Sequence, residues 1–257
     1  MHVKALFDIA GKVALVTGGS RGLGFQIAQA LGEMGCRVAI TARKADELEA
    51  ARALFAAQGI DVLTIVNDLT QTAGIAGLVD AVVAGLGPID ILVNNAGATW
   101  GAPAEDYPDQ AWHKVMDLNV DAIFFLTREV GKRCMIPRSQ GKIINIASVA
   151  GLRGSATTVT TIAYNTSKGA LVNFTRALAS EWGKHNINVN AICPGFFPSK
   201  MSAGLLEQVR DTVISRAPLH RIGGDDDLKG AAVFLASEAS RHITGQNLAV
   251  DGGMSSV

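Results

Sequence analysis

The chain has 257 residues, of which 48% are hydrophobic and 18% are charged. This composition provides enough apolar side chains for a buried core and differs from that of disordered proteins. The 23 basic and 23 acidic residues cancel, so we expect neither nucleic acid nor a membrane surface as a partner.

The sequence gives no sign of a membrane segment or a metal site. No apolar run approaches the ~20 residues that span a bilayer, and the first ten residues lack the apolar segment of a secretory signal. Cys36, Cys134 and Cys193 lie far apart, without a Cys-x-x-Cys pair, which indicates reduced core thiols. We therefore expect a cytoplasmic protein without a bound metal.

The segment Val13–Gly24 predicts a strand, a glycine-rich turn and a helix. Gly18 permits a tight turn, Gly22 lacks the side chain that would block a pyrophosphate, and Gly24 lets the helix start lie against the strand. The first amides of the helix would then face an anion. Because the spacing departs from the common Gly-x-Gly-x-x-Gly fingerprint, a glycine-rich turn without a ligand remains an alternative.

Strand and helix patterns alternate along the rest of the chain. Long helices are predicted over Ala111–Lys132 and Tyr164–Trp182, and an earlier helix places Leu48 and Leu54 on its inner face. The predicted strands are Val13–Val16, Arg37–Thr41, Asp61–Val66, Ile89–Val93, Lys142–Ala147, Ile187–Cys193 and Gln246–Val250. This alternation predicts a single α/β domain over residues 1–257, a Rossmann-type doubly wound parallel seven-stranded sheet with helices on both faces. Ligands bind such sheets at the carboxyl ends of the strands.

The end of the second strand indicates which dinucleotide would bind. The strand runs into Arg43 and Lys44, with no acidic residue before Asp46. A carboxylate here would receive the ribose hydroxyls of NAD, whereas the 2'-phosphate of NADP needs cations. Arg21, in the glycine turn, can approach the same corner, and a guanidinium matches phosphate geometry well. The sequence thus favours NADP(H), although these cations could instead be solvated residues at a helix start.

Polar residues also occupy the ends of later strands. Asp68 could accept a hydrogen bond from an exocyclic amine or cap the next helix. The run Asn94–Gly97 could border a ligand or form a plain turn. Ser148 ends the fifth strand, and Asn119 lies in the middle of a helix, where its backbone-competing amide invites a specific role.

Tyr164 and Lys168 are four residues apart and therefore share one helix face. In order and approximate spacing, the chain resembles the short-chain dehydrogenase/reductase family over essentially its whole length. The motifs that carry the resemblance are Thr17–Gly24, Asn94–Gly97, Asn119, Ser148, Tyr164 with Lys168, and Pro194–Gly195. The resemblance implies hydride transfer between a nicotinamide and a carbonyl or carbinol carbon.

The resemblance also implies roles for individual residues. Ser148 would hydrogen-bond the substrate oxygen, and Tyr164 would exchange a proton with it. Lys168 would hold the nicotinamide ribose, and its charge would lower the pKa of the Tyr164 phenol. Asn119 would distort its helix and link the proton relay to solvent. The expected cofactor-binding residues are Gly18, Ser20, Arg21, Gly22, Leu23, Gly24, Arg43, Asp68, Leu69, Asn95, Ala96, Gly97, Tyr164, Lys168, Pro194, Gly195 and Ser199.

The segment after the sixth predicted strand is expected to contact the substrate. Residues 196–217 predict an apolar flap, and Phe196, Phe197 and Met201 suggest an apolar part of the substrate. Arg153 and Lys200 could meet an anionic group.

Two features depart from the family pattern. The gap between Ser148 and Tyr164 is longer than the commonest family spacing, which predicts an enlarged loop over the substrate. Ser199 stands where a threonine often bonds the carboxamide, and the neighbouring Pro198 could alter its approach.

The leading functional hypothesis is an NADP(H)-dependent oxidoreductase acting on a ketone or secondary alcohol of the 3-oxoacyl-thioester or sugar-acid type. The alternatives are a catalytically silent dinucleotide-binding sensor or scaffold and an NAD-dependent alcohol dehydrogenase. The helix Tyr164–Trp182 carries apolar residues on more than one stripe, which predicts a homo-oligomer, a dimer or tetramer, unless the monomer buries them.

Overall fold

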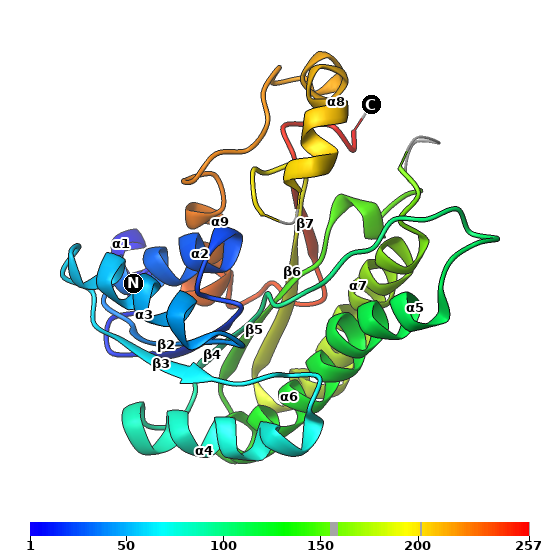
Figure 1. The fold of residues 1–257 in the computed structure, drawn as a ribbon. Coiled ribbons are helices and arrows are strands. Elements are labelled where there is room, and N and C mark those ends of the chain that lie inside the picture. The colour runs from blue at the N-terminus through cyan, green and yellow to red at the C-terminus, as the bar shows by residue number, and fades with distance from the viewer. Residues whose placement is uncertain (155–158, 201, 257) are drawn as a thin grey trace.

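A computed structural model describes residues 1–154, 159–200 and 202–256 (Figure 1). Its centre is a seven-stranded parallel sheet with the strand order β3-β2-β1-β4-β5-β6-β7. The strands are β1 (Val13–Thr17), β2 (Arg37–Ala42), β3 (Val62–Val66), β4 (Ile91–Asn94), β5 (Gly141–Ile146), β6 (Ile187–Pro194) and β7 (Asn247–Val250). The predicted doubly wound sheet is confirmed.

The strand order reverses between β1 and β4, which are neighbours in the sheet although two strands separate them in sequence. Every residue of β1, β4 and β5 is buried, as expected for strands covered on both faces. The loops that leave β1 and β4 diverge to opposite faces. This divergence opens a crevice at the carboxyl ends of the strands, where α/β proteins of this type bind ligands.

Helices cover both faces of the sheet (Figure 1). They are α1 (Val3–Leu6), α2 (Gly22–Glu33), α3 (Ala45–Ala56), α4 (Ile75–Leu86), α5 (Asp109–Met116), α6 (Ala122–Val130), α7 (Ile162–Trp182), α8 (Ala203–Arg216) and α9 (Lys229–Ala236). Side chains of α2, α3 and α9 share one apolar core with the sheet, and those of α4, α6 and α7 share another. The helix α8 stands above the carboxyl ends of β6 and β7.

Two local predictions need correction. Leu54 is 57% exposed, and its neighbour Phe55 is buried together with Leu48 on the inner face of α3, because Phe55 lies seven residues, two helical turns, after Leu48. The predicted helix Ala111–Lys132 is continuous in direction but consists of α5 and α6, joined by a π-helical turn over Asp117–Asp121 and extended by another over Gly131–Met135. Such turns commonly mark functional positions in helices.

Gly131 tests how tightly the helices pack. A Cβ atom at Gly131 would collide with the ring of Trp182, whereas one at Gly77 in α4 would meet none of the described residues beyond its own helix turn within 4 Å. We expect Gly131→Ala to lower the free energy of unfolding by about 1–3 kcal/mol through overpacking. Gly77→Ala should leave it unchanged or raise it by up to about 1 kcal/mol. Urea unfolding monitored by circular dichroism measures both, and equal stabilities would contradict the packing.

Candidate active site

The glycine turn between β1 and α2 forms an open cradle. Gly18 and Gly22 adopt positive φ angles of 64° and 56°, which favour glycine. A Cβ atom at Gly24 would collide with the Asn95 side-chain amide and the Gly18 carbonyl. The side chain of Arg21, the N-cap residue, has no acceptor for the helix amides and pairs with Glu47. The first amides of α2, which include those of Leu23 and Gly24, are therefore placed to bind an anion.

Asn95 and Thr17 hold this cradle against the loop after β4. The Asn95 side chain donates to the carbonyls of Thr17 at 2.8 Å and Gly18 at 3.2 Å. In return, the Thr17 hydroxyl accepts hydrogen bonds from the backbone amides of Asn95 at 2.9 Å and Ala96 at 3.0 Å. The predicted residues Gly18, Gly24, Asn95 and Ala96 are thus brought together at the point where the strand order reverses.

The predicted phosphate-reading cations lie at the carboxyl end of β2. Arg21 and Lys44 both approach the carboxylate of Glu47, at 2.5 Å and 3.3 Å. Arg43 is exposed beside them. The Asp68 carboxylate accepts hydrogen bonds from the Thr70 amide at 3.1 Å and the Thr70 hydroxyl at 2.8 Å. It therefore closes a local turn and is not the predicted cap of the next helix, whose N-cap positions are Gln71 and Gly74. Leu69 next to Asp68 is buried.

Asn119 lies within the π-helical turn and is fully buried. Its side-chain oxygen accepts from the Ala98 amide at 2.8 Å, and its side-chain nitrogen donates to the Ala98 carbonyl at 2.9 Å. The same nitrogen donates to the Ser167 hydroxyl at 2.9 Å, and that hydroxyl donates to the Tyr164 carbonyl at 2.8 Å. Asn119 therefore ties the loop after β4 to the helix that carries Tyr164. The predicted helix distortion is present.

Tyr164, Lys168 and Ser148 come together at the carboxyl end of β5. The Lys168 ammonium lies 5.6 Å from the centroid of the Tyr164 ring and donates to the Ile146 carbonyl at 2.6 Å. The Ser148 side chain is hydrogen-bonded to the Tyr164 phenol. Gly97 closes the same space, because a Cβ atom there would lie 3.2 Å from the Asn119 oxygen and 3.8 Å from the Lys168 nitrogen. The four predicted catalytic residues thus form one cluster.

Burial controls the protonation of this cluster. It lowers the pKa of Lys168 to about 8 and raises the pKa of the Tyr164 phenol, which the hydrogen bond with Ser148 opposes. The predicted lowering of the Tyr164 pKa by Lys168 is therefore not the net effect here, because removal from water penalises the phenolate more strongly. Burial likewise raises the pKa of the nearby Cys193 thiol to about 11, so this cysteine is neutral.

The segment after β6 borders the glycine cradle. The Gly195 amide donates to the Val250 carbonyl at 3.0 Å, and a Cβ atom at Gly195 would strike Asp251. The Ser199 side chain approaches the glycine turn, since its Cβ lies 3.7 Å from a Cβ built on Gly22. Its hydroxyl is 2.9 Å from the Ser202 hydroxyl. Ser199 therefore lies beside the glycine turn, whereas Gly195 packs against the end of β7 and Asp251.

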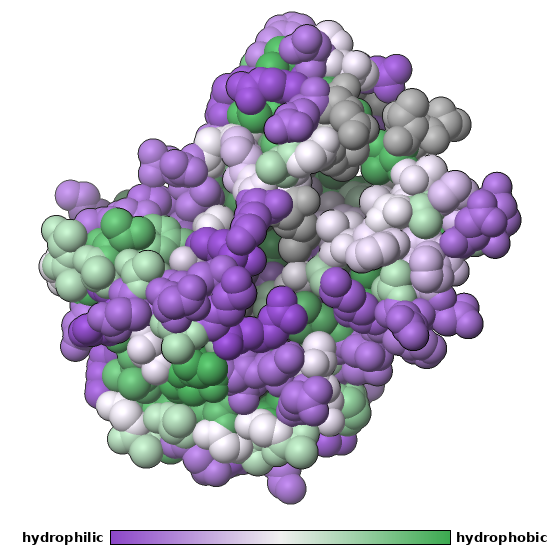
Figure 2. All heavy atoms as spheres, in the orientation of Figure 1, coloured by the Kyte–Doolittle hydropathy of each residue, from purple (hydrophilic) through white to green (hydrophobic). Residues whose placement is uncertain are grey.

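The residues predicted to contact the substrate lie in different environments. Phe197 is buried in the core shared with α2 and α9, so its ring cannot line a substrate pocket as predicted. Arg153 and Lys200 are exposed. Met201 and residues 155–158 of the predicted enlarged loop lie outside the described residues. Figure 2 shows a hollow in the surface below the segment that contains α8.

Sequence reasoning missed two residues with clear positions in this site. Ser167 connects Asn119 to α7, and its place three residues after Tyr164 on the same helix face was the available signal. Glu47 pairs with two predicted phosphate-reading cations, and its position three residues after Lys44 gave a similar signal.

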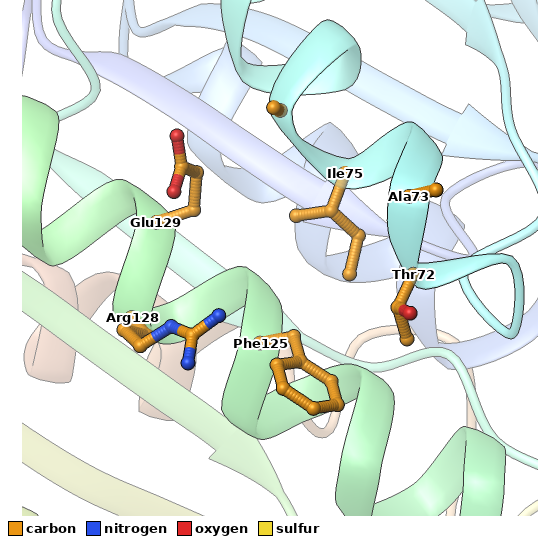
Figure 3. Close-up of a pocket in the computed structure, with 7 residues that line it drawn as sticks. Thr72, Ala73, Ile75, Phe125, Arg128 and Glu129 are labelled. Atoms are coloured by element: carbon orange, nitrogen blue, oxygen red, sulfur yellow. The ribbon is translucent and has the colours of Figure 1, made fainter.

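A separate cavity of about 300 Å³ lies between the start of α4 and α6 (Figure 3). Ile75 and Thr72 line one side, and Phe125, Arg128 and Glu129 line the other. None of these residues belongs to the cluster around Tyr164.

Within the described ranges, no group of three or more His, Cys, Asp or Glu side chains could hold a metal ion. In the same part of the chain, no helix has the length and apolar character needed to cross a membrane.

Comparison with known proteins identifies the class. A family model described as enoyl-(acyl carrier protein) reductase matches residues 18–255. A gluconate 5-dehydrogenase of Gluconobacter oxydans is 40% identical over 251 residues, which cover 97% of this chain and 96% of that protein. A rhamnolipids biosynthesis 3-oxoacyl-[acyl-carrier-protein] reductase of Pseudomonas aeruginosa is 40% identical over 252 residues, 96% and 97% of the two chains.

Among solved structures, a gluconate 5-dehydrogenase from Burkholderia cenocepacia in complex with NADP and tartrate is 35% identical, with a TM-score of 0.93 and full coverage of both chains. The chain belongs to the short-chain dehydrogenase/reductase family. It is an oxidoreductase that acts on CH–OH and C=O groups. The predicted family, fold and enzyme class are confirmed, and the NADP in that structure agrees with the predicted cofactor.

The low pKa of Lys168 predicts a pH-dependent stability. Between pH 8 and 10.5 the unfolded chain binds this proton and the folded chain does not, so the stability of the wild type rises with pH in that window. Between these pH values, we expect the free energy of unfolding of the wild type to rise by up to about 3 kcal/mol relative to that of Lys168→Met, at about 1.4 kcal/mol per pKa unit. Urea unfolding at several pH values measures this difference.

Lys184→Met, which removes an exposed lysine, is the control. The free energy of unfolding of the wild type should show no such pH-dependent gain relative to this variant. A parallel pH dependence of the wild type and Lys168→Met would contradict the perturbed lysine.

Proposed function

We propose that the protein interconverts a ketone and a secondary alcohol on a hydroxylated carboxylic acid, with NADP(H) as cofactor and Tyr164 as the proton-transferring group. The observation that carries the proposal is the placement of the Tyr164 phenol beside Ser148 and Lys168, in the crevice that also contains the glycine cradle. A sensor or scaffold that only binds a dinucleotide has no need of this arrangement.

The cradle is suited to a dinucleotide. The turn through Gly18 and Gly22 leaves room for a pyrophosphate, since among the described residues outside the turn and α2 only the Ser199 side chain lies within 4 Å of a Cβ built on Gly22. Bound NADPH would supply the hydride for the carbonyl carbon. Lys168 would hold the nicotinamide ribose hydroxyls and Ser199 the carboxamide, whereas Arg21 and Arg43 would bind the 2'-phosphate.

Each catalytic residue has one task in this proposal. Ser148 donates a hydrogen bond to the substrate carbonyl oxygen and orients it. Tyr164 gives its proton to that oxygen during reduction and takes it back during oxidation. The charge on Lys168 offsets the cost of a buried phenolate. Asn119 holds α7 in place through Ser167 and connects the relay to solvent.

The substrate class is inferred from charge and from relatives. Arg153 and Lys200 are exposed cations that could meet a carboxylate, and the burial of Phe197 removes one reason to expect an apolar substrate. Relatives include enzymes named gluconate 5-dehydrogenase and 5-keto-D-gluconate 5-reductase. A 3-oxoacyl thioester, the substrate type named for another relative, is the comparison substrate in the assays below.

The domain and its surroundings complete the proposal. Residues 1–257 form a single NADP(H)-binding domain, with 196–217 as a flap over the substrate; the position of α8 above the sheet supports it. The protein assembles as a homo-oligomer, a dimer or tetramer. Phe124 on α6 is 44% exposed, and its ring centroid lies 6.4 Å from that of Phe174 on α7, so aromatic surface of these two helices is available to a second copy. We place it in the cytoplasm, where its three buried free cysteines stay reduced.

Removal of the Tyr164 hydroxyl tests the mechanism. We expect Tyr164→Phe to lower kcat by ~10²–10⁴, the usual contribution of a positioned acid or base, while NADPH binding stays nearly unchanged. Oxidation of NADPH with 5-ketogluconate and with a 3-oxoacyl thioester, followed by absorbance, measures activity. The other tyrosine of the chain, Tyr107, contacts the Trp100 carbonyl, and Tyr107→Phe serves as control. An undiminished rate in Tyr164→Phe would contradict the assignment.

Removal of a cation tests the cofactor preference. We expect Arg43→Ala to weaken NADPH binding roughly tenfold or more, because charge-assisted hydrogen bonds contribute about 1.5–3 kcal/mol, and to change NADH binding little. Titration of nicotinamide fluorescence measures both. Arg37→Ala, at the opposite end of β2, is the matched control. Equal weakening of both cofactors would show that Arg43 does not read the 2'-phosphate.

A further inference from the structure

Glu47 occupies the first turn of α3 and faces the corner where the predicted phosphate-reading cations lie. Its carboxylate is 2.5 Å from the Arg21 guanidinium and 3.3 Å from the Lys44 ammonium. The Glu47 side chain is only 22% exposed, whereas that of Arg21 is 51% exposed. One carboxylate thus gathers two cations that come from different segments, the glycine turn and the end of β2.

The sheet register places this ion-pair cluster at the adenosine end of the cofactor site. Strands β1 and β2 run side by side, with Thr17 opposite Thr41, and the Gly18 amide donates to the Thr41 carbonyl at 2.8 Å. The glycine turn and the segment Ala42–Lys44 therefore leave the sheet together. A ribose phosphate at the end of β2 would have to share this corner with Glu47.

We propose that Glu47 is a specificity-determining residue that competes with the 2'-phosphate of NADP(H) for Arg21 and Lys44. The inference rests on the proposed cofactor site and adds to it a residue that opposes NADP(H). In the absence of the phosphate, the carboxylate takes its place as the anion bound to both cations. NADP(H) must therefore replace an existing ion pair, whereas NAD(H) leaves that pair intact.

Charge balance gives the direction of the effect. A phosphate monoester carries nearly two negative charges at neutral pH, so it attracts Arg21 and Lys44 more strongly than one carboxylate does and is repelled by Glu47. Arg43 lies in the same segment, and among the described residues it has no ion-pair partner. It can bind the phosphate without first leaving a carboxylate. Glu47 thus reduces the NADP(H) preference that the three cations create.

The test compares nucleotide affinities of the full-length protein without substrate. We expect Glu47→Gln to bind NADPH roughly 1.4- to fivefold more tightly, because exposed ion pairs contribute about 0.2–1 kcal/mol, and to bind NADH as the wild type does. Titrations of nicotinamide fluorescence give both dissociation constants. Glu49→Gln is the matched control, because Glu49 lies two residues further along α3 and pairs with Arg52 at 2.6 Å.

A second variant shows whether Glu47 acts through Arg21. In an Arg21→Ala variant, Glu47→Gln should increase the NADPH affinity less than it does in the wild type. In the wild type, the increase caused by Glu47→Gln should become smaller at high salt. Unchanged NADPH affinity in Glu47→Gln, or weaker NADH binding, would overturn the inference while leaving the proposed function intact. Failure of the wild type to bind NADPH would instead refute the proposed cofactor, and the inference with it.

Discussion

A buried ammonium anchors the candidate active site. Lys168 is 4% exposed, and its nitrogen donates to the carbonyl of Ile146, the last residue of β5, at 2.6 Å. This bond holds α7 against the carboxyl edge of the sheet, and the tyrosine one turn earlier is thereby fixed beside Ser148. The charge is costly in this position, as the lowered pKa of Lys168 shows. Such a cost is typical of a group retained for chemistry.

Polar side chains connect the elements that meet at this edge. Asn119 joins the loop after β4 to α7, and Asn95 joins the same loop to the glycine turn. Deeper in the sheet, the Asn94 amide donates to Asn145, and the Asn145 amide donates to the Thr175 hydroxyl on α7, both at 2.9 Å. Hydrogen bonds of this kind fix geometry because a buried donor without a partner is costly. The two halves of the crevice therefore keep a defined separation.

The two ends of the crevice follow different physical rules. Around Tyr164 and Lys168, burial decides the protonation of the side chains. Around Arg21, Lys44 and Glu47, the charges lie near the surface, where solvent and salt screen them. In the function that we propose, chemistry and cofactor selection can therefore vary with little mutual effect. Two relatives that are each 40% identical to this chain carry different substrate names.

The sequence by itself determined the sheet and its glycine turn, because local periodicity and spacing place side chains on known faces and at strand ends. The expected catalytic residues came from the resemblance to the short-chain dehydrogenase/reductase family. Contacts between distant segments decided the rest. The tertiary structure buried Phe197 and Phe55, exposed Leu54, paired Arg21 with Glu47 across 26 residues and reversed the expected shift in the Tyr164 pKa. Burial and ion pairing depend on which elements meet in space, and one-dimensional spacing does not contain that information.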